Sequence, residues 1–331
     1  MPDINVGVLG ASSLVGGCVL SKLADAGYRA VAFSRATLDP AQSREKLGSG
    51  ALDNVEAVDS GFRRNDGENE SSIFGVNRAD AEGGAAQWIK LADAAGKMSG
   101  GALDIALWIC AAPIWVLPGH FQLLESCGVR KVVALSSTSR FSKDDSSDIA
   151  EQQLAKRLAD AELQVQAWAQ QRGIEWVILR PTLIYGLGRD KNITEMVRLI
   201  QRFGFFPLFG KAHGLRQPIH ADDVAAACVA ALQAPAAANR AFNISGAETL
   251  GYREMMVRVF TALGRRPRLL NVPLWAFRLA VVLLRVLPRY RHWSAAMAER
   301  MNRDLVFDHA DAAQAFGFKP GGFALTQGDL P

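Results

Sequence analysis

The sequence predicts an α/β fold, with a doubly wound parallel sheet and a smaller, mainly helical C-terminal lobe. Apolar runs suited to buried strands alternate with helical patterns through the first half of the 331 residues. This order is typical of a parallel sheet with helices on both faces. Beyond about residue 185 the chain becomes rich in glycine and aromatic residues, and then mainly helical. We therefore expect a second lobe to begin there.

The first 35 residues predict a site for a dinucleotide. Ile4–Leu9 suits a buried strand, residues 10–16 form a turn of small residues, a helix follows to about Ala26, and Tyr28–Phe33 suits a second strand. Such a turn holds a pyrophosphate on bare backbone N–H groups and the helix N-terminus. An ordinary strand–helix turn is the alternative, because the middle glycine of a three-glycine pattern is a serine here. The residues expected at the pyrophosphate are Gly10, Ser12, Ser13, Leu14 and Val15.

The residues after the second strand bear on which dinucleotide binds. The strand ends in Ser34 and Arg35, with no adjacent acid. In this kind of site an acidic residue binds the ribose 2′-hydroxyl of NAD, whereas an arginine suits the 2′-phosphate of NADP. We therefore predict NADP(H) rather than NAD(H), with Ser34 and Arg35 at the phosphate. A solvated surface arginine is the alternative.

The remaining strands of the first half follow in order. A polar stretch at about 55–72 indicates a surface insertion. A third strand is expected at 73–77, and Asp80 after it could meet the adenine edge or cap a helix that runs to about Met98. Strands are also expected at 104–110, 131–135 and 175–179, with a long helix at 148–172. We assign the ends of these three strands to the same cofactor site, at Ala111, Ala112, Ser136 and Pro181.

Composition narrows the function classes. The net charge is +4 with both signs interspersed and no dense basic run, so we expect no nucleic-acid partner. The four cysteines are widely separated and form no CxxC pair, which predicts neither a metal site nor a disulfide framework. The N-terminus leads straight into a strand, so no signal peptide is expected and a cytoplasmic location is predicted.

Several segments together resemble a known family, the short-chain dehydrogenase/reductases of the extended or atypical kind, also called the NAD-dependent epimerase/dehydratase group. The segments are the glycine turn at 10–16 and residues 134–138, 180–186, 217–225 and 242–246. The resemblance implies a Rossmann-type sheet of seven parallel strands, a bound NAD(P) and a C-terminal substrate lobe. The domain boundaries expected are 1–184 and 185–331, with 217–245 partly returning to the sheet.

The resemblance also implies a catalytic Ser or Thr, and a Tyr and Lys written YxxxK on the long helix. The Tyr donates a proton beside the carbonyl, and the nearby Lys lowers its pKa. Ser137 or Thr138 matches the first role, and Lys156 matches the lysine, with Asp160 four residues later as in the family. The tyrosine position is Gln152. Because an amide has no dissociable proton, the usual reductase mechanism is in doubt. Lys156 can still bind the ribose hydroxyls of the nicotinamide half, so cofactor binding can survive; a solvated helix face is the alternative for Lys156.

Candidates on the substrate side come from the later segments. Arg216 could clamp an anion or form a surface salt bridge, and His120 could face the substrate cleft or simply pack. His220 with the two following acids lacks further ligands for a metal, so a structural role is expected, with Asp222 capping the helix that begins at Val224. The substrate-side candidates are His120, Thr138, Tyr185 and Arg216.

Residues 274–287 are apolar apart from Arg278 and Arg285. The run is too short and too charged to span a bilayer, which needs about 20 apolar residues. It could lie in a membrane interface, which would place the protein peripherally at the inner membrane face. The alternative is a cover for the substrate lobe or a contact in a homodimer.

Three functional hypotheses remain open from the sequence. The first is an NADP(H)-dependent oxidoreductase acting on a carbonyl, sugar-like or lipid-like substrate, with Gln152 or water in place of tyrosine. The second is a non-catalytic NADP(H)-binding sensor, scaffold or membrane-complex subunit. The third is a nucleotide-sugar epimerase or dehydratase. The missing tyrosine counts most strongly against this hypothesis. The residues of the second lobe do not indicate which small molecule is the substrate.

Overall fold

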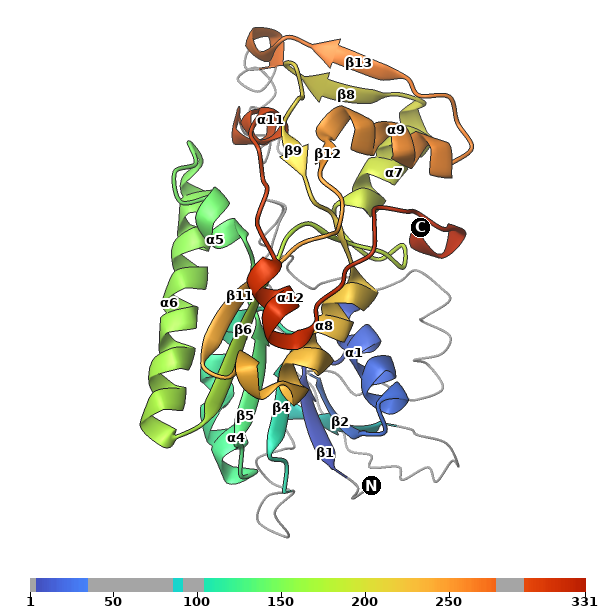
Figure 1. Cartoon of the computed structure of the whole chain (residues 1–331). Coiled ribbons are helices and arrows are strands. Elements are labelled where there is room, and N and C mark those ends of the chain that lie inside the picture. The colour runs from blue at the N-terminus through green and yellow to red at the C-terminus, as the bar shows by residue number, and fades with distance from the viewer. Residues whose placement is uncertain (1–3, 35–85, 92–103, 278–294) are drawn as a thin grey trace, which may run out of the picture.

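The computed structural model describes residues 4–34, 86–91, 104–277 and 295–331. Seven parallel strands form its main sheet in the order β11–β6–β5–β4–β1–β2–β3 (Figure 1). This order confirms the predicted doubly wound sheet. The strands are β1 Asn5–Leu9, β2 Arg29–Ser34, β3 Gln87–Lys90, β4 Leu107–Cys110, β5 Lys131–Leu135, β6 Glu175–Pro181 and β11 Arg240–Ile244.

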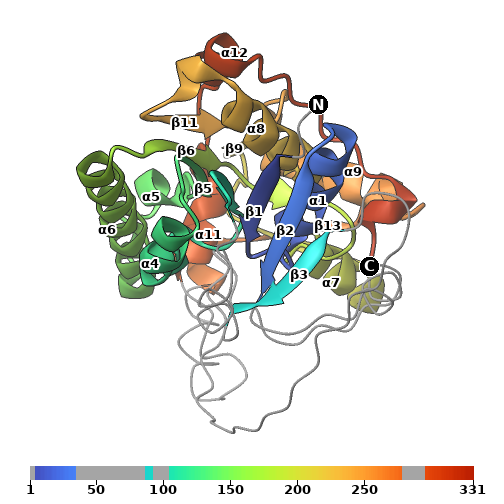
Figure 2. The same cartoon turned by 90° about the horizontal axis from the view of Figure 1, so that it is seen from below.

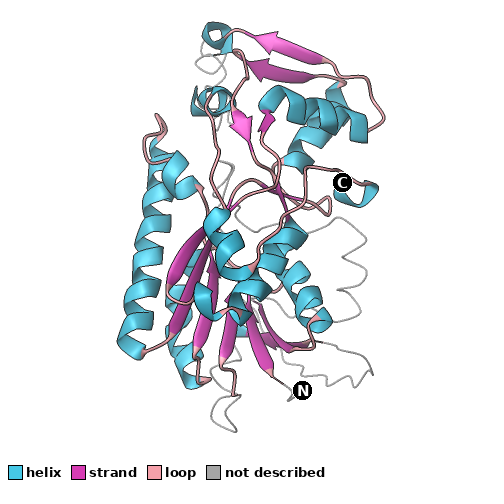
Figure 3. Ribbon diagram, viewed as in Figure 1, coloured by secondary structure: helices cyan, strands magenta, loops and turns pink. Residues whose placement is uncertain are grey.

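Helices cover both faces of this sheet (Figures 2 and 3). The central strands are apolar on both faces because each face packs against helices. In β1, for example, Val6 and Val8 belong to the core under α1 and α8, whereas Leu9 belongs to the core under α6. One face carries α1 Leu14–Asp25, α8 Ala221–Gln233 and α12 Ala310–Phe316; the other carries η1 Ile114–His120, α4 Phe121–Ser126 and α6 Ile149–Arg172.

The third strand differs from the prediction. β3 pairs with β2 from Val31 opposite Gln87 to Ser34 opposite Lys90, so it lies within the stretch predicted as a helix. An edge strand of four residues with a single fully buried side chain, Ile89, leaves little alternation to read. The predicted strand at 73–77, Asp80 and the insertion at 55–72 lie outside the described residues.

The second lobe has its own apolar core, built around Phe206, Met256 and Phe260. Short strand pairs accompany its helices: β8 with β13, β9 with β12, and β7 with β10. Its elements are β7 Ile184–Tyr185, α7 Ile193–Phe203, β8 Phe206–Phe209, β9 Leu215–Arg216, β10 Ile219–His220, β12 Leu250–Gly251, α9 Tyr252–Ala262, β13 Leu269–Val272 and α11 Ala295–Asn302. Three short turns complete the described chain, namely α5 Ser139–Ser142, η2 Pro235–Ala237 and η4 Gln327–Asp329.

Candidate functional site

The glycine turn between β1 and α1 is packed so closely that only glycine fits at two positions. Gly10 has a φ of +80°, and a Cβ on it would lie 2.5 Å from the backbone nitrogen of Ala112. A Cβ on Gly16 would lie 2.2 Å from the carbonyl oxygen of Gly10. The absence of these side chains brings the N-terminus of α1 against the carboxyl ends of β1 and β4.

Ser13 fixes the start of α1. Its hydroxyl accepts a hydrogen bond from the Gly16 N–H at 3.0 Å and donates one to the Ala111 carbonyl at 3.1 Å. The N–H groups of Leu14 and Val15, in the first turn, have no intrahelical acceptor and can face an anion. Ser12 is half-buried beside them. The structure thus brings the predicted pyrophosphate residues together with Ala111 and Ala112, whose N–H groups donate to the Leu9 carbonyl.

The end of β2 joins the same edge of the sheet. The Phe33 carbonyl accepts hydrogen bonds from the N–H groups of Gly10 and Ala11, and Ser34 is buried next to it. Ser34 therefore lies beside the glycine turn. Arg35 lies outside the described residues.

A buried ionic cluster, which the sequence did not predict, lies behind the ends of β5 and β6. Glu162 of α6 is fully buried and accepts hydrogen bonds from the Ser136 hydroxyl at 2.5 Å and from Nε and Nη2 of Arg180 at 3.0 and 2.6 Å. Arg140 donates to the same carboxylate. The hydroxyl of Ser136, predicted to contact the cofactor, is thus engaged by Glu162.

The register of α6 argues against the roles predicted for Gln152 and Lys156. The face of α6 that packs on the sheet includes Leu158 and Glu162. Gln152, Lys156 and Asp160 are exposed on another side of the helix, because residues four apart share a face. Gln152 donates only to the Ser146 carbonyl, at 2.8 Å.

The buried acid, Glu162, indicates that the YxxxK pattern falls on other residues of α6. The family pattern has an acid four residues after the lysine, and the buried acid of α6 is Glu162 rather than Asp160. Counting back from Glu162 gives Leu158 at the lysine position and Leu154 at the tyrosine position. Both leucines pack in the core between α6 and the sheet. Neither can donate a proton or bind a ribose hydroxyl.

The side chains of Ser137 and Thr138, which follow β5, form hydrogen bonds with backbone groups. The Ser137 hydroxyl accepts from the Ser139 N–H at 3.1 Å, and the Thr138 hydroxyl donates to the Pro181 carbonyl at 3.1 Å. The contact of Thr138 joins the carboxyl ends of β5 and β6. The structure therefore brings Ser137, Thr138 and Pro181 together.

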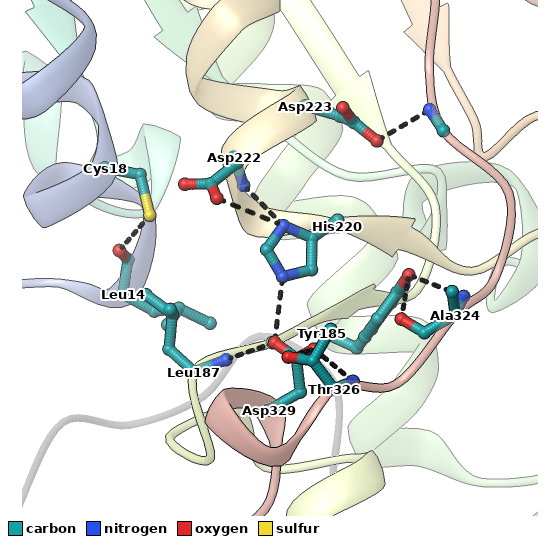
Figure 4. Close-up of polar contacts among 12 residues, drawn as sticks. Leu14, Cys18, Tyr185, Leu187, His220, Asp222, Asp223, Ala324, Thr326 and Asp329 are labelled. Carbon is teal, nitrogen blue, oxygen red and sulfur yellow. Dashed lines mark hydrogen bonds and ion pairs between the residues drawn. The ribbon is translucent and has the colours of Figure 1, made fainter. Parts of the chain in front are cut away.

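Tyr185 and His220 form part of a cluster that holds the C-terminal residues (Figure 4). The Tyr185 hydroxyl lies 3.3 Å from the Ala324 carbonyl, and burial raises the pKa of Tyr185 to about 12. His220 Nε2 lies 3.0 Å from Asp329 Oδ1, and its Nδ1 accepts from the Asp222 N–H at 3.2 Å. His220, rather than Asp222, is therefore the residue that caps α8, which begins at Ala221.

Asp329 makes attachment of the C-terminal turn sensitive to acid. Burial by itself raises the pKa of Asp329, but hydrogen bonds from Thr326, His220 and the Leu187 N–H lower it below its ordinary value. The carboxylate therefore stabilises the fold above the unfolded pKa of about 4, and this contribution is lost as the pH falls. We expect unfolding free energy measured from pH 7 to pH 3 to fall more steeply for the native chain than for Asp329→Asn. Parallel curves would contradict this.

The guanidinium of Arg216 is engaged by backbone carbonyls. The residue is buried, and its guanidinium donates to the carbonyl oxygens of Leu215 at 2.7 Å, of Arg303 at 2.8 Å and of Arg300. It also lies over the Tyr252 ring, 5.4 Å from the centroid. Its N–H groups therefore satisfy backbone carbonyl groups at the end of α11, which ends at Asn302. His120 is half-buried where η1 meets α4, and burial lowers its pKa.

The cysteines and acids add no second reactive centre among the described residues. All four cysteines are buried, and burial raises the pKa of Cys18 and of Cys110 to about 12. Such thiols are poor nucleophiles because little thiolate forms. Within the part of the chain that the structure describes, no group of three or more His, Cys, Asp or Glu side chains could hold a metal ion.

Solved structures share this fold over almost the whole chain. UDP-glucose 4-epimerase from Thermotoga maritima, with UDP-glucose bound, matches with a TM-score of 0.61 and 16% identity, covering 96% of this chain and 94% of that one. UDP-glucuronic acid 4-epimerase from Bacillus cereus, in complex with NAD, matches with a TM-score of 0.62 and 15% identity, covering 98% and 93%. At this identity the likeness shows the fold alone.

Sequence comparison gives shorter matches with curated proteins. UDP-glucose 4-epimerase of Vibrio cholerae is 26% identical over 162 residues, which is 49% of this chain and 47% of that protein. A subunit of Dictyostelium discoideum NADH dehydrogenase, alpha subcomplex subunit 9, is 25% identical over 96 residues, 29% of this chain and 26% of that protein. The matches thus span about half or less of these relatives.

The family itself is shown by a longer match. The sequence model of the NAD dependent epimerase/dehydratase family matches residues 6–245, from β1 through the end of β11. This range includes the glycine turn, the strand ends with their hydroxyl residues, and the α6 helix that carries Glu162. The chain therefore belongs to the NAD dependent epimerase/dehydratase family.

Proposed function

We propose that this protein binds a nicotinamide dinucleotide and does not carry out the tyrosine-dependent hydride chemistry of its family. The observation that carries the proposal is the register of α6. Leu154 and Leu158 stand in line with the buried Glu162, where the family pattern has its tyrosine and lysine. A leucine pair cannot supply the proton that hydride transfer to a carbonyl requires.

The glycine turn supports the binding half of the proposal. The N–H groups of Leu14 and Val15, at the start of α1, are available to an anion, and Gly10 and Gly16 let the turn pack closely against the ends of β1 and β4. We propose NADP(H) over NAD(H) because Arg35 follows β2 in the sequence and suits a 2′-phosphate. When bound, the dinucleotide would supply a redox-active nicotinamide near the carboxyl ends of β4 and β5.

The relatives support two different roles. The 4-epimerases favour chemistry on a nucleotide sugar, whereas the NADH dehydrogenase subunit favours a part in a larger assembly. We favour the non-catalytic role, because only that role needs no proton donor on α6. Turnover on a nucleotide sugar is the alternative that the following experiment decides.

The experiment combines the purified full chain with NAD⁺ or NADP⁺ and, in turn, UDP-glucose, UDP-glucuronic acid or UDP-N-acetylglucosamine. Absorbance at 340 nm reports reduced nicotinamide, and chromatography reports new sugars. We expect dinucleotide binding by calorimetry but neither signal. A reduced nicotinamide or an epimerised sugar would overturn the non-catalytic role, whereas absence of binding would overturn the dinucleotide site.

Gln152→Tyr tests the register argument directly. Because residue 152 is exposed on another side of α6 from Glu162, we expect a tyrosine there to give no reductase or epimerase activity in the same assay. Gln153→Tyr, one position along the same exposed stretch, serves as the matched control. Activity in Gln152→Tyr alone would mean that residue 152 reaches the nicotinamide, and would refute the assignment of the tyrosine position to Leu154.

A further inference from the structure

Large apolar side chains are exposed at the far end of the second lobe. Phe203 at the end of α7 is 56% exposed, and Phe205, just before β8, is 38% exposed. Leu270 of β13 is 53% exposed. Phe203, Phe205 and Leu270 are here called the apolar tip; β8 and β13 lie at the top of Figure 1, away from the main sheet.

The fold of the lobe places these side chains on its outer surface. β8 pairs in parallel with β13, and Pro207 stands opposite Leu270, so both side chains point to the same face of this small sheet. The alternate residues Phe206 and Leu208 point inward, into the core of the lobe. The rings of Phe203 and Phe205 lie 6.2 Å apart, which makes them one contact surface.

Arginines lie near the apolar tip. The stretches 198–209 and 264–275 together contain five arginines and neither Asp nor Glu. Arg202 lies over the Phe203 ring, 5.2 Å from its centroid. Arg265 donates to the Ile200 carbonyl at 2.9 Å, so it closes the end of α7 while keeping its charge at the surface. The other arginines of the two stretches are Arg198, Arg266 and Arg268.

We propose that the apolar tip inserts into the interface of an anionic lipid bilayer. Exposed phenyl rings beside arginines suit this boundary, where rings enter the acyl region and cations meet lipid headgroups. The charge also disfavours a second copy of the chain on the same surface, because arginines would face arginines. No helix among the described residues is long and apolar enough to cross a bilayer. This proposal is independent of dinucleotide binding.

Co-sedimentation with vesicles tests the proposal. The full chain is mixed with vesicles of phosphatidylcholine alone, or of phosphatidylcholine with phosphatidylglycerol. We expect binding to the second kind, weakened by added salt because exposed charges are screened. Phe203→Ser combined with Phe205→Ser should weaken binding about tenfold or more, since two phenyl rings no longer leave water.

Matched controls come from exposed apolar residues elsewhere. Ile149 and Leu163, on α6, are 70% and 58% exposed, and their replacement by serine should leave vesicle binding unchanged. No binding of the native chain to anionic vesicles would overturn the proposal, as would equal losses in the control variants. A dimer in solution that the Phe203 and Phe205 variant dissociates, without any vesicle binding by the native chain, would assign the tip to self-association instead.

Discussion

Replacing Ser12 with aspartate is expected to weaken dinucleotide binding by at least about a hundredfold, because the new carboxylate stands where the pyrophosphate would lie. Ser12 is half-buried, next to the N–H groups of Leu14 and Val15. The fold itself should remain as stable as the native one or gain stability, since an acid near a helix N-terminus interacts favourably with the helix dipole. Calorimetric titration with NADPH and a melting curve on the same sample measure both effects.

Ser12→Ala is the matched control for that variant. It removes the hydroxyl without adding charge, so the affinity should stay within a few-fold of the native value. Unaltered affinity in Ser12→Asp would mean that any dinucleotide binds away from the N-terminus of α1. Loss of affinity in Ser12→Ala as well would instead show that the hydroxyl itself contacts the ligand.

Removing the carboxylate of Glu162 is expected to cost the largest amount of stability. Glu162→Ala leaves the Arg180 guanidinium unpaired in a largely buried place and also removes the partner of Ser136. Breaking a buried ion pair in this way typically costs about 3–5 kcal/mol. Denaturant unfolding followed by circular dichroism measures the change, and the midpoint should move strongly to lower denaturant.

Asp160→Ala provides the comparison on the same helix. Asp160 is exposed, so its loss should change the free energy of unfolding by less than about 0.5 kcal/mol. Equal effects of the two substitutions would contradict the assignment of Glu162 as the buried acid of α6. The assignment of Leu158 and Leu154 to the lysine and tyrosine positions, which is counted back from Glu162, would then have no basis.

The elements near the N-terminus could be predicted because their signals are local. β1, the glycine turn, α1 and β2 follow one another within 35 residues, and each has a clear apolar pattern or a small-residue turn. β3 could not be found in this way. At the edge of the sheet one of its faces contributes little to the core, so Gln87–Lys90 lacks the alternation that a strand prediction needs.

The candidate site was harder to predict because its partners are distant in the sequence. Arg216 is held by carbonyls of Arg300 and Arg303, and His220 by Asp329, which are 84 or more residues away. On α6, Lys156 is a lysine of suitable spacing but lies off the apolar stripe. The stripe of Leu154, Leu158 and Val165 was present in the sequence and could have shown that Glu162 is buried.

The most direct test of the central claim is a calorimetric titration of the full chain with NADPH, NADP⁺, NADH and NAD⁺. We expect one binding site, with NADPH or NADP⁺ bound more tightly than the matching NAD form. We also expect this preference to disappear in Arg35→Ala. Failure of all four dinucleotides to bind would contradict the claim that the glycine turn and α1 form a working dinucleotide site.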